Sequence, residues 1–309
     1  MRRRSTRAAL AGAFLVLAAI AVAWAEGLHS SASEKIARAA QEVAYVNLEK
    51  ARDLFAEVRS ATKPGQPEWE QAIFGEATCI WHLLPIERSN AEQAAKLFAQ
   101  LIEQAPQSRF TPRAMLNLGR ILELPEDRDD PIDLPGARVW YQKVLDGWPN
   151  DPIAGEATLR IAGTYIQTYD DAQLRKGVAL LRNWVEEHPR DPLASIMWQY
   201  LAETYFFPLN DYQRSLEAYE KVDELGWADQ GLQGKFYWRI AQMSERFLKN
   251  RDAAIKFYNK IIDETPNSGK LYEAQLALKR LGAPVHQPAM FQRLPDGNDP
   301  TPPAGTDAR

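Results

Sequence analysis

The chain has 309 residues, of which 45% are hydrophobic and 25% are charged, a composition typical of folded soluble proteins. The formal net charge is −4, and residues 26–309 alone carry 33 basic and 41 acidic side chains, because the first 25 residues contain four arginines and no acid. An acidic body lacks the clustered Lys and Arg that displace counterions from nucleic acids, so we expect no nucleic-acid partner.

The first 25 residues have the layout of an export segment. Four arginines stand among the first seven residues, and an uncharged run from Ala8 to Ala25 ends in the small-x-small pattern Ala23-Trp24-Ala25. Residues 8–25 are just long enough to span a bilayer as a helix, so two alternatives stay open: a cleaved signal peptide or an uncleaved membrane anchor. Both place the rest of the chain outside the cytoplasm, in the periplasm or secreted, because the positive flank stays inside.

Beyond this segment we predict a first helix that begins near Ser33 and runs toward Ser60. From there on, one pattern recurs six times at intervals of 38–43 residues: a small residue, a bulky residue at +4, a large apolar residue at +7 and usually a proline at +12. Offsets of +4 and +7 lie on one face of a helix, and a proline ends the helix. The copies are Ala51/Phe55/Val58, Ala94/Phe98/Leu101, Ala137/Tyr141/Val144, Gly177/Leu181/Trp184, Ser215/Tyr219/Val222 and Ala254/Tyr258/Ile261.

A second apolar pattern follows each stop and predicts another helix. Ala114, Ala157, Met197 and Ala274 stand eight residues past the proline, and Leu118, Ile161, Leu201 and Leu278 stand one turn later. The repeat before the last one keeps the pair Ile240-Ala241 but is one residue out of register. Each repeat is therefore expected to be two amphipathic helices, neither of which can bury its apolar face without stacking on a neighbour.

These residues resemble the tetratricopeptide repeat, whose pattern has a Leu-Gly-like pair and a Tyr in the first helix, then Ala, a ring and Pro in the second. The resemblance covers roughly residues 34–283 and implies an all-α, right-handed superhelical solenoid of five to six antiparallel helix pairs. We assign residues 26–283 to this domain and 284–309 to a disordered Pro-rich tail. The units exceed the usual 34 residues, and the extra length falls in loops such as 124–136. The phrases FAQLIEQAPQSRFTPRAMLNLG and YNKIIDETPNSGKLYEAQLALKRLG are similar to exported bacterial repeat proteins that assist envelope and outer-membrane assembly.

No motif for catalysis, a cofactor or a metal stands out. The sequence has no phosphate-binding glycine loop, no nucleophile elbow and no HExxH zinc pattern. The acidic stretch 126–133 lacks the glycine and glutamate of a calcium loop, because Ile132 and Arg138 occupy those places. The single cysteine, Cys79, lies in an apolar helical run and is predicted to be a buried thiol. We therefore expect a non-enzymatic protein without cofactor or metal.

The family resemblance also implies where a partner would bind. First helices line the inner face of such arrays, and the matching positions here are Arg120, Glu123, Gln199, Glu203, Trp238, Gln242 and Glu245. This mixed polar surface with one large ring suits a protein or peptide partner, and the first hypothesis is an interaction scaffold of the bacterial cell envelope. The alternative is a structural module that self-associates or is tethered to the membrane by an uncleaved N-terminal helix.

Overall fold

A computed structural model describes residues 31–124 and 131–288 of the chain. The predicted export segment and residues 289–309 of the predicted tail lie outside the described residues, and both domain boundaries stay predictions. The chain divides into two compact units, Met1–Gly177 and Val178–Arg309.

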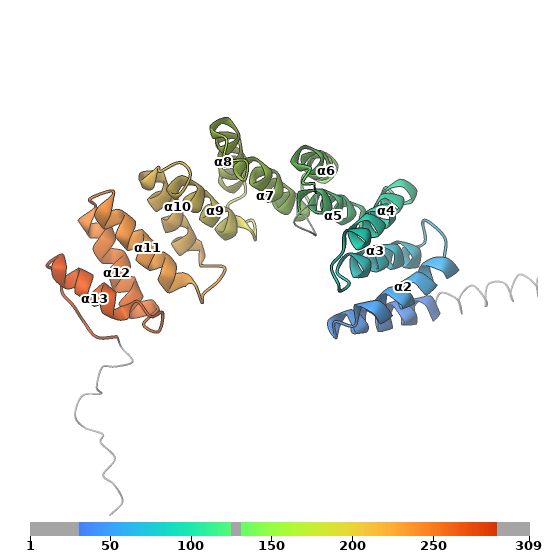
Figure 1. The fold of residues 1–309 in the computed structure, drawn as a ribbon, viewed down its shortest axis with the longest axis horizontal. Coiled ribbons are helices and arrows are strands. Elements are labelled where there is room, and N and C mark those ends of the chain that lie inside the picture. Colours follow the sequence, from blue (N-terminus) through green and yellow to red (C-terminus); the bar gives the residue numbers. More distant parts are fainter. Residues whose placement is uncertain (1–30, 125–130, 289–309) are drawn as a thin grey trace, which may run out of the picture. The chain divides into compact units, whose positions relative to one another are not determined.

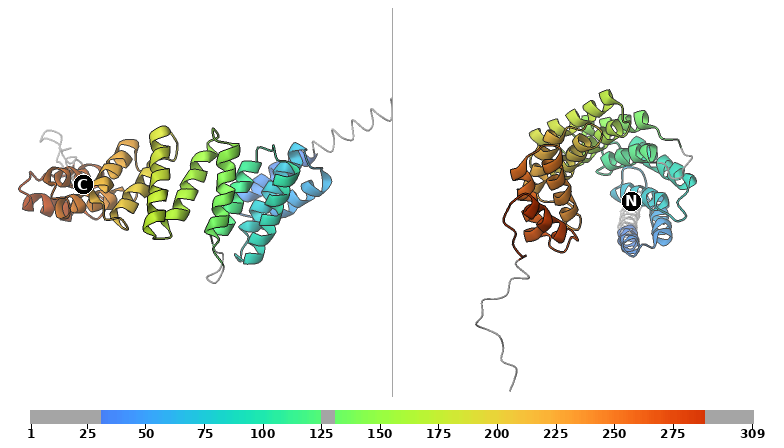
Figure 2. Two further views of the ribbon diagram at one scale, coloured as in Figure 1. Left: turned by 90° about the horizontal axis from the view of Figure 1, so that it is seen from above. Right: turned by 60° about the vertical axis from the view of Figure 1, so that its left-hand side comes forward.

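Both units are built of helices that run antiparallel to their neighbours in sequence (Figures 1 and 2). The described residues contain no strand, and the predicted all-α class with paired helices is confirmed. The first unit contains a helix over residues 31–44, α2 (Leu48–Ala61), α3 (Pro67–Trp81), α4 (Arg88–Gln104), α5 (Thr111–Glu123), α6 (Leu134–Gly147), α7 (Ile153–Ile166) and the start of α8 (Asp171–Glu187). The second contains the rest of α8, α9 (Ala194–Phe206), α10 (Tyr212–Leu225), α11 (Gln233–Arg246), α12 (Arg251–Glu264) and α13 (Leu271–Arg280).

The repeated apolar pattern forms the core of each unit. All residues of the six second-helix copies are buried except Trp184, which is half-buried. Helices α4, α6, α8 and α12 each end two residues before the proline of their copy, because the residue preceding a proline is pushed out of the helical region. The sequence pattern therefore identifies the buried face of all six second helices and the end of these four.

Gly119, the small residue that follows Leu118 in α5, makes room for the ring of the second helix of the same repeat. A Cβ placed on Gly119 in α5 would come within 2.3 Å of a carbon of the Tyr141 ring in α6. Tyr141 is fully buried, so its ring has little freedom to withdraw. The close packing of the two helices of this repeat therefore requires glycine at position 119.

Substitution of Gly119 by alanine is expected to destabilise the protein by about 1–3 kcal/mol, since the added methyl group overpacks the Tyr141 ring. Gly147 provides a matched control at the end of α6, because a Cβ there meets no atom within 4 Å. Chemical denaturation of both variants measures the difference. An equal midpoint for Gly119→Ala and Gly147→Ala would contradict the close packing.

The predicted single helix from Ser33 toward Ser60 is wrong. The structure breaks it at Tyr45–Asn47, and Val46 adopts a left-handed conformation with φ of 60°. Two backbone hydrogen bonds that depart from the helical i to i−4 pattern end the first helix. The Val46 N–H donates to the Val43 carbonyl at 2.9 Å, and the Asn47 N–H donates to the Glu42 carbonyl at 2.9 Å. Such endings usually carry glycine at the left-handed position, and a β-branched valine gives no signal of a turn.

Polar contacts link neighbouring repeats in the second unit. The Tyr237 hydroxyl of α11 lies 2.7 Å from the Asp223 carboxylate of α10 and 2.6 Å from the Glu264 carboxylate of α12. The ammonium of Lys260 reaches both carboxylates, at 3.0 Å and 2.7 Å respectively. Burial alone would lower the pKa of Lys260, but its bonds to Glu264 and Asp223 outweigh burial and raise it above the ordinary value. The ion therefore stays charged and holds α10 and α12 in one register.

Candidate functional site

Arg120 and Glu123, predicted to contact a partner, lie in α5 of the first unit and are engaged within it. The Glu123 side chain is nearly buried, and its carboxylate accepts a hydrogen bond of 2.6 Å from the Tyr141 hydroxyl. The guanidinium of Arg120 stands 4.9 Å from the centre of the Trp81 ring, a cation–π contact. Burial lowers the pKa of Arg120 below its ordinary value. Both side chains thus have a structural role, and their partner-binding role stays a prediction.

Gln199 and Glu203 lie one turn apart on α9 in the second unit. The Gln199 amide donates to the Glu203 carboxylate at 3.2 Å, and the Arg239 guanidinium of α11 stands 3.9 Å from the same carboxylate. Arg239 also donates to the Tyr219 hydroxyl at 3.3 Å and lies 5.1 Å from the centre of the Phe207 ring. Arg239 is not among the residues predicted to bind a partner. It connects Gln199 and Glu203 of α9 to α11 through its contact with Glu203.

Trp238 is the one large ring among the predicted residues, and it is half-buried on α11. The Lys270 ammonium stands 5.3 Å from the centre of a Trp238 ring, and the Tyr258 ring centre lies 5.6 Å away. These contacts hold the indole in place while leaving part of it accessible. A positioned, partly exposed tryptophan is the kind of side chain that anchors a protein partner.

Gln242 and Glu245 complete the predicted set on α11, and both bind the Tyr258 hydroxyl of α12. The Gln242 amide donates to this hydroxyl, which in turn donates to Glu245 at 2.8 Å. Arg280 of α13 lies 2.6 Å and 2.8 Å from the two Glu245 oxygens. Burial acts to raise the pKa of Glu245, but the bonds from Tyr258 and Arg280 outweigh it and leave the pKa below the ordinary value. We call Gln199, Glu203, Trp238, Gln242 and Glu245 the first-helix strip.

Two of the three glutamates of the predicted set have equivalent roles in two repeats. Glu123 and Glu245 each lie in the last turn of a first helix and accept a hydrogen bond from the tyrosine of the following second helix, Tyr141 or Tyr258. Burial, together with the bond to the carboxylate, raises the pKa of both tyrosines above the ordinary value. The sequence signal is a glutamate at the end of a first helix together with a tyrosine at the ring position of the second.

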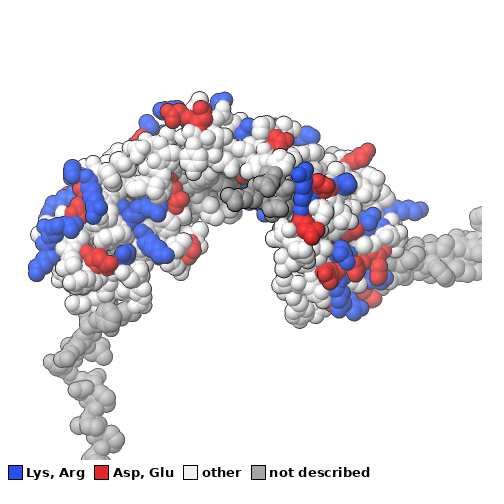
Figure 3. All heavy atoms as spheres, in the orientation of Figure 1, with Lys and Arg blue, Asp and Glu red and all other residues white. Residues whose placement is uncertain are grey.

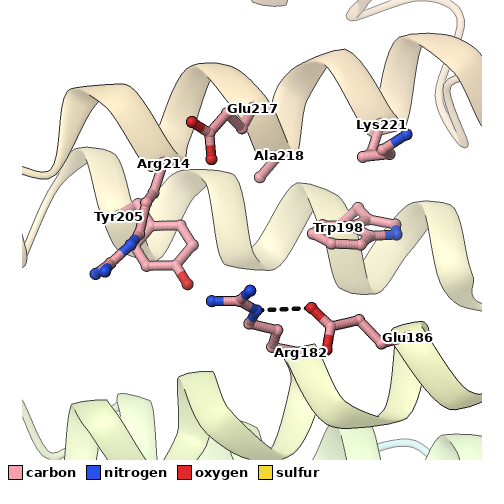
Figure 4. A pocket seen from close by; sticks show the side chains of 8 residues that line it. All are labelled: Arg182, Glu186, Trp198, Tyr205, Arg214, Glu217, Ala218 and Lys221. Atoms are coloured by element: carbon pink, nitrogen blue, oxygen red, sulfur yellow. Dashed lines mark hydrogen bonds and ion pairs between the residues drawn. The ribbon is translucent and has the colours of Figure 1, made fainter.

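A groove on the other side of α9 was not predicted (Figure 4). It has a volume of about 310 Å³ and lies between α8 and α10, with α9 as its floor. Trp198 and Tyr205, two turns apart, form the floor; Trp198 is half-buried and Tyr205 is buried. Its remaining lining residues are Arg182, Glu186, Arg214, Glu217, Ala218 and Lys221.

The charged groups of this groove are paired with one another or with their neighbours. Arg182 bonds Glu186 at 2.7 Å, and both side chains are about half exposed. Lys221 bonds Glu224 at 2.7 Å, and Arg214 bonds Asp211 at 3.1 Å. Exposed pairs of this kind contribute about 1 kcal/mol or less and exchange readily with water. The groove is a second polar surface with an aromatic floor.

The visible surface mixes both signs of charge, with basic side chains more frequent over α11–α13 (Figure 3).

Among residues 31–124 and 131–288, no three His, Cys, Asp or Glu side chains are grouped to hold a metal ion. Within the same residues, no helix is both long and apolar enough to cross a membrane. Cys79 is buried, and burial raises the pKa of its thiol to about 11.

Comparisons with known proteins support the repeat. A family model described as tetratricopeptide repeat matches residues 236–268, which cover most of α11 and all of α12. A solved structure of pilF from Pseudomonas aeruginosa superposes with a TM-score of 0.53 at 12% identity, over 81% of this chain and 99% of that one. The TPR2AB domain of yeast Sti1 in complex with pHSP90 aligns at a TM-score of only 0.30 and 14% identity, over 82% of this chain and 99% of that one. No curated protein matches the chain in sequence.

The likeness to pilF shows a shared fold and nothing more, because the identity is low. Tetratricopeptide repeats form a family of non-enzymatic scaffolds that generally mediate protein–protein interaction. This general role is the starting point for the function of the chain.

Proposed function

We propose that the chain is an exported interaction scaffold of the cell envelope, which holds a segment of a partner protein on the first-helix strip. The observation that carries this proposal is the position of Trp238, half-buried and held between Lys270 and Tyr258 on a face of the second unit that also carries amide and carboxylate groups. Export rests on the arrangement of the first 25 residues.

The chemistry of the strip suits a peptide segment. Each carboxamide has two N–H groups and one carbonyl oxygen, and Gln199 and Gln242 each spend one N–H group on a neighbouring side chain. The remaining groups can bind a peptide backbone, while Trp238 covers an apolar side chain. Glu203, about one third exposed, favours a partner with a basic group at that point.

The groove over α9 is the competing location for the same function. It also offers a tryptophan, Trp198, but its charged groups are arranged in exposed pairs, and none of its charges is held across two repeats as Glu203 is by Arg239. A partner would have to displace or bridge those pairs. We therefore place the partner on the strip.

Capture of a partner by the strip is expected to fall about 30-fold in the double variant Trp238→Ala/Glu203→Lys, the loss typical of a hot-spot residue. Proteins are cross-linked in intact cells with a reagent that does not cross the inner membrane, recovered with the chain and quantified by mass spectrometry. Trp198→Ala/Arg214→Glu in the groove is the matched control and should retain capture. Far-ultraviolet circular dichroism checks that both variants stay helical.

Each part of the proposal can fail separately. Loss of capture in the groove variant with retention in the strip variant would move the site to the groove. Capture that appears only with a membrane-permeant reagent would contradict the extracytoplasmic location. Recovery of only the chain itself would favour the self-associating module.

A further inference from the structure

Four aromatic rings form a continuous cluster at the turns that join first helices to second helices in the second unit. The cluster, which we call the aromatic edge, consists of Phe206, Phe207, Tyr212 and Phe247. The centre of the Phe206 ring lies 4.8 Å from that of Phe207 and 5.6 Å from that of Tyr212. The Tyr212 ring stacks on Phe247 at 4.3 Å. Because Tyr212 and Phe247 belong to successive repeats, this contact places the two turns side by side.

Two rings of the aromatic edge are exposed to solvent. Phe207 directly follows α9 and is 56% exposed, and Phe247 directly follows α11 and is 54% exposed. Burying either ring would be favourable, but the described residues leave both uncovered. Exposed apolar side chains that adjoin one another mark an interaction surface, whereas single ones are ordinary.

The charge around the aromatic edge is positive. Counted over nine residues from the end of each first helix, segments 206–214 and 246–254 together contain four basic and two acidic side chains, although the whole chain has a net charge of −4. The corresponding turn of the first unit, residues 166–174, contains two acidic side chains and no basic one. Figure 3 likewise shows basic side chains more frequently over α11–α13. The aromatic edge therefore favours a negatively charged partner.

Two of the basic side chains flank an exposed ring. Arg246 precedes Phe247, Lys249 follows it by two residues, and both side chains are exposed. One of the two nearby carboxylates, that of Asp211, is paired with the Arg214 guanidinium at 3.1 Å. The surface thus combines exposed rings with exposed cations, the composition of protein surfaces that bind the interface of anionic membranes.

We propose that the aromatic edge docks on an anionic bilayer, with Phe207 and Phe247 in the interfacial region and Arg246 and Lys249 against lipid phosphate groups. Aromatic rings gain from leaving water at this interface, and basic side chains add attraction to its negative surface potential. The two turns lie side by side, so one flat surface can receive both rings. This inference does not depend on whether the first-helix strip binds a partner.

A second copy of the chain is a poorer occupant of the aromatic edge. In a symmetric dimer through this surface, the same patch of both chains would meet. Arg246 and Lys249 of one chain would then face the same two cations of the other, and like charges oppose such a contact. An anionic bilayer meets the rings and the cations together.

A fluorescent dye beside the aromatic edge tests the docking in the full chain. Gln213, which is exposed and follows Tyr212, is replaced by cysteine and labelled with an environment-sensitive dye, and the native Cys79 is buried and stays unlabelled. Vesicles of phosphatidylglycerol should shift the dye emission to shorter wavelength, whereas vesicles of phosphatidylcholine should not. The same dye at Gln230→Cys, in the exposed turn after α10, should respond to neither. Because the reading is local, insertion of residues 1–25 into the vesicle would not imitate it.

Two double variants separate the apolar contribution from the electrostatic one. Phe207→Ser/Phe247→Ser and Arg246→Glu/Lys249→Glu should each reduce the emission shift about tenfold. Tyr169→Ser is the matched control, because this ring is 77% exposed on the acidic turn of the first unit, and the variant should retain the full shift. The substituted side chains are all exposed, so circular dichroism should show unchanged helicity.

Four results would overturn the proposal. Emission that stays unshifted with phosphatidylglycerol would mean that the edge does not reach the bilayer, and an equal shift with both lipids would mean that anionic headgroups play no part. A shift that appears without vesicles and grows with protein concentration would assign the edge to a second copy. A full shift in both double variants would assign the contact to other residues.

Discussion

Replacement of Tyr141 by alanine is expected to lower the free energy of unfolding by about 3–5 kcal/mol, the cost of deleting a large buried ring. Tyr141 is completely buried, packs on Gly119 and binds Glu123 through its hydroxyl. The variant therefore opens a cavity and also leaves a nearly buried carboxylate without its donor. Urea denaturation followed by circular dichroism measures the change.

Tyr141→Phe separates the two causes. It keeps the ring and removes only the hydroxyl, so the expected loss is about 1–3 kcal/mol, the cost of an unsatisfied buried acceptor. Tyr169, which is 77% exposed, provides a control at which alanine should change stability little. If Tyr141→Phe and Tyr141→Ala were equally unstable, the ring would contribute nothing and the packing account would be wrong.

Alkaline pH is expected to unfold the protein through its buried tyrosines. Burial raises the pKa of Tyr219 from 10.0 to about 12, and burial together with hydrogen bonds to carboxylates raises the pKa values of Tyr141, Tyr237 and Tyr258. Above pH 10 the unfolded chain releases these protons while the folded chain still holds them. The stabilisation is therefore complete below pH 10 and is lost as the pH rises, with Tyr219 alone accounting for about 2 kcal/mol by pH 12.

The measurement follows phenolate absorbance and helicity together as the pH is raised. The buried tyrosines should ionise only as helicity is lost, so the two signals should share a transition above pH 10. Tyr219→Phe removes one of the ionisable groups. Between neutral pH and pH 12 this variant should therefore lose less of its free energy of unfolding than the unsubstituted protein does. Complete tyrosine ionisation near pH 10 with helicity intact would contradict the raised pKa values.

The fold could largely be predicted from sequence because one apolar pattern serves every repeat. The positions of Phe98, Tyr219 and Tyr258 are fixed by helical spacing, and all three are fully buried. The turn at Val46 could not be predicted, since its left-handed conformation is imposed by the packing of two helices and not favoured by valine.

The surroundings of the candidate site were harder to predict than the fold. Glu123 and Tyr141 stand 18 residues apart, whereas Glu245 and Tyr258 stand 13 apart, so no constant spacing marks the pair. The groove is assembled from three helices, and its Arg182–Glu186 pair has the spacing of an ordinary solvated helix pair.

The link between α10, α11 and α12 also limits how the array could be rearranged. Tyr237 requires an aspartate four residues after the ring position of the preceding second helix, and Asp223 provides it. Leu145 and Ile102 occupy the same place in α6 and α4. Transplanting the α11–α12 repeat behind either helix would replace the Asp223 carboxylate by an aliphatic side chain, so that Tyr237 and Lys260 would keep Glu264 of their own repeat and lose their contact with the preceding one. The repeats share one pattern of buried residues, but they cannot exchange places along the chain without losing contacts between neighbours.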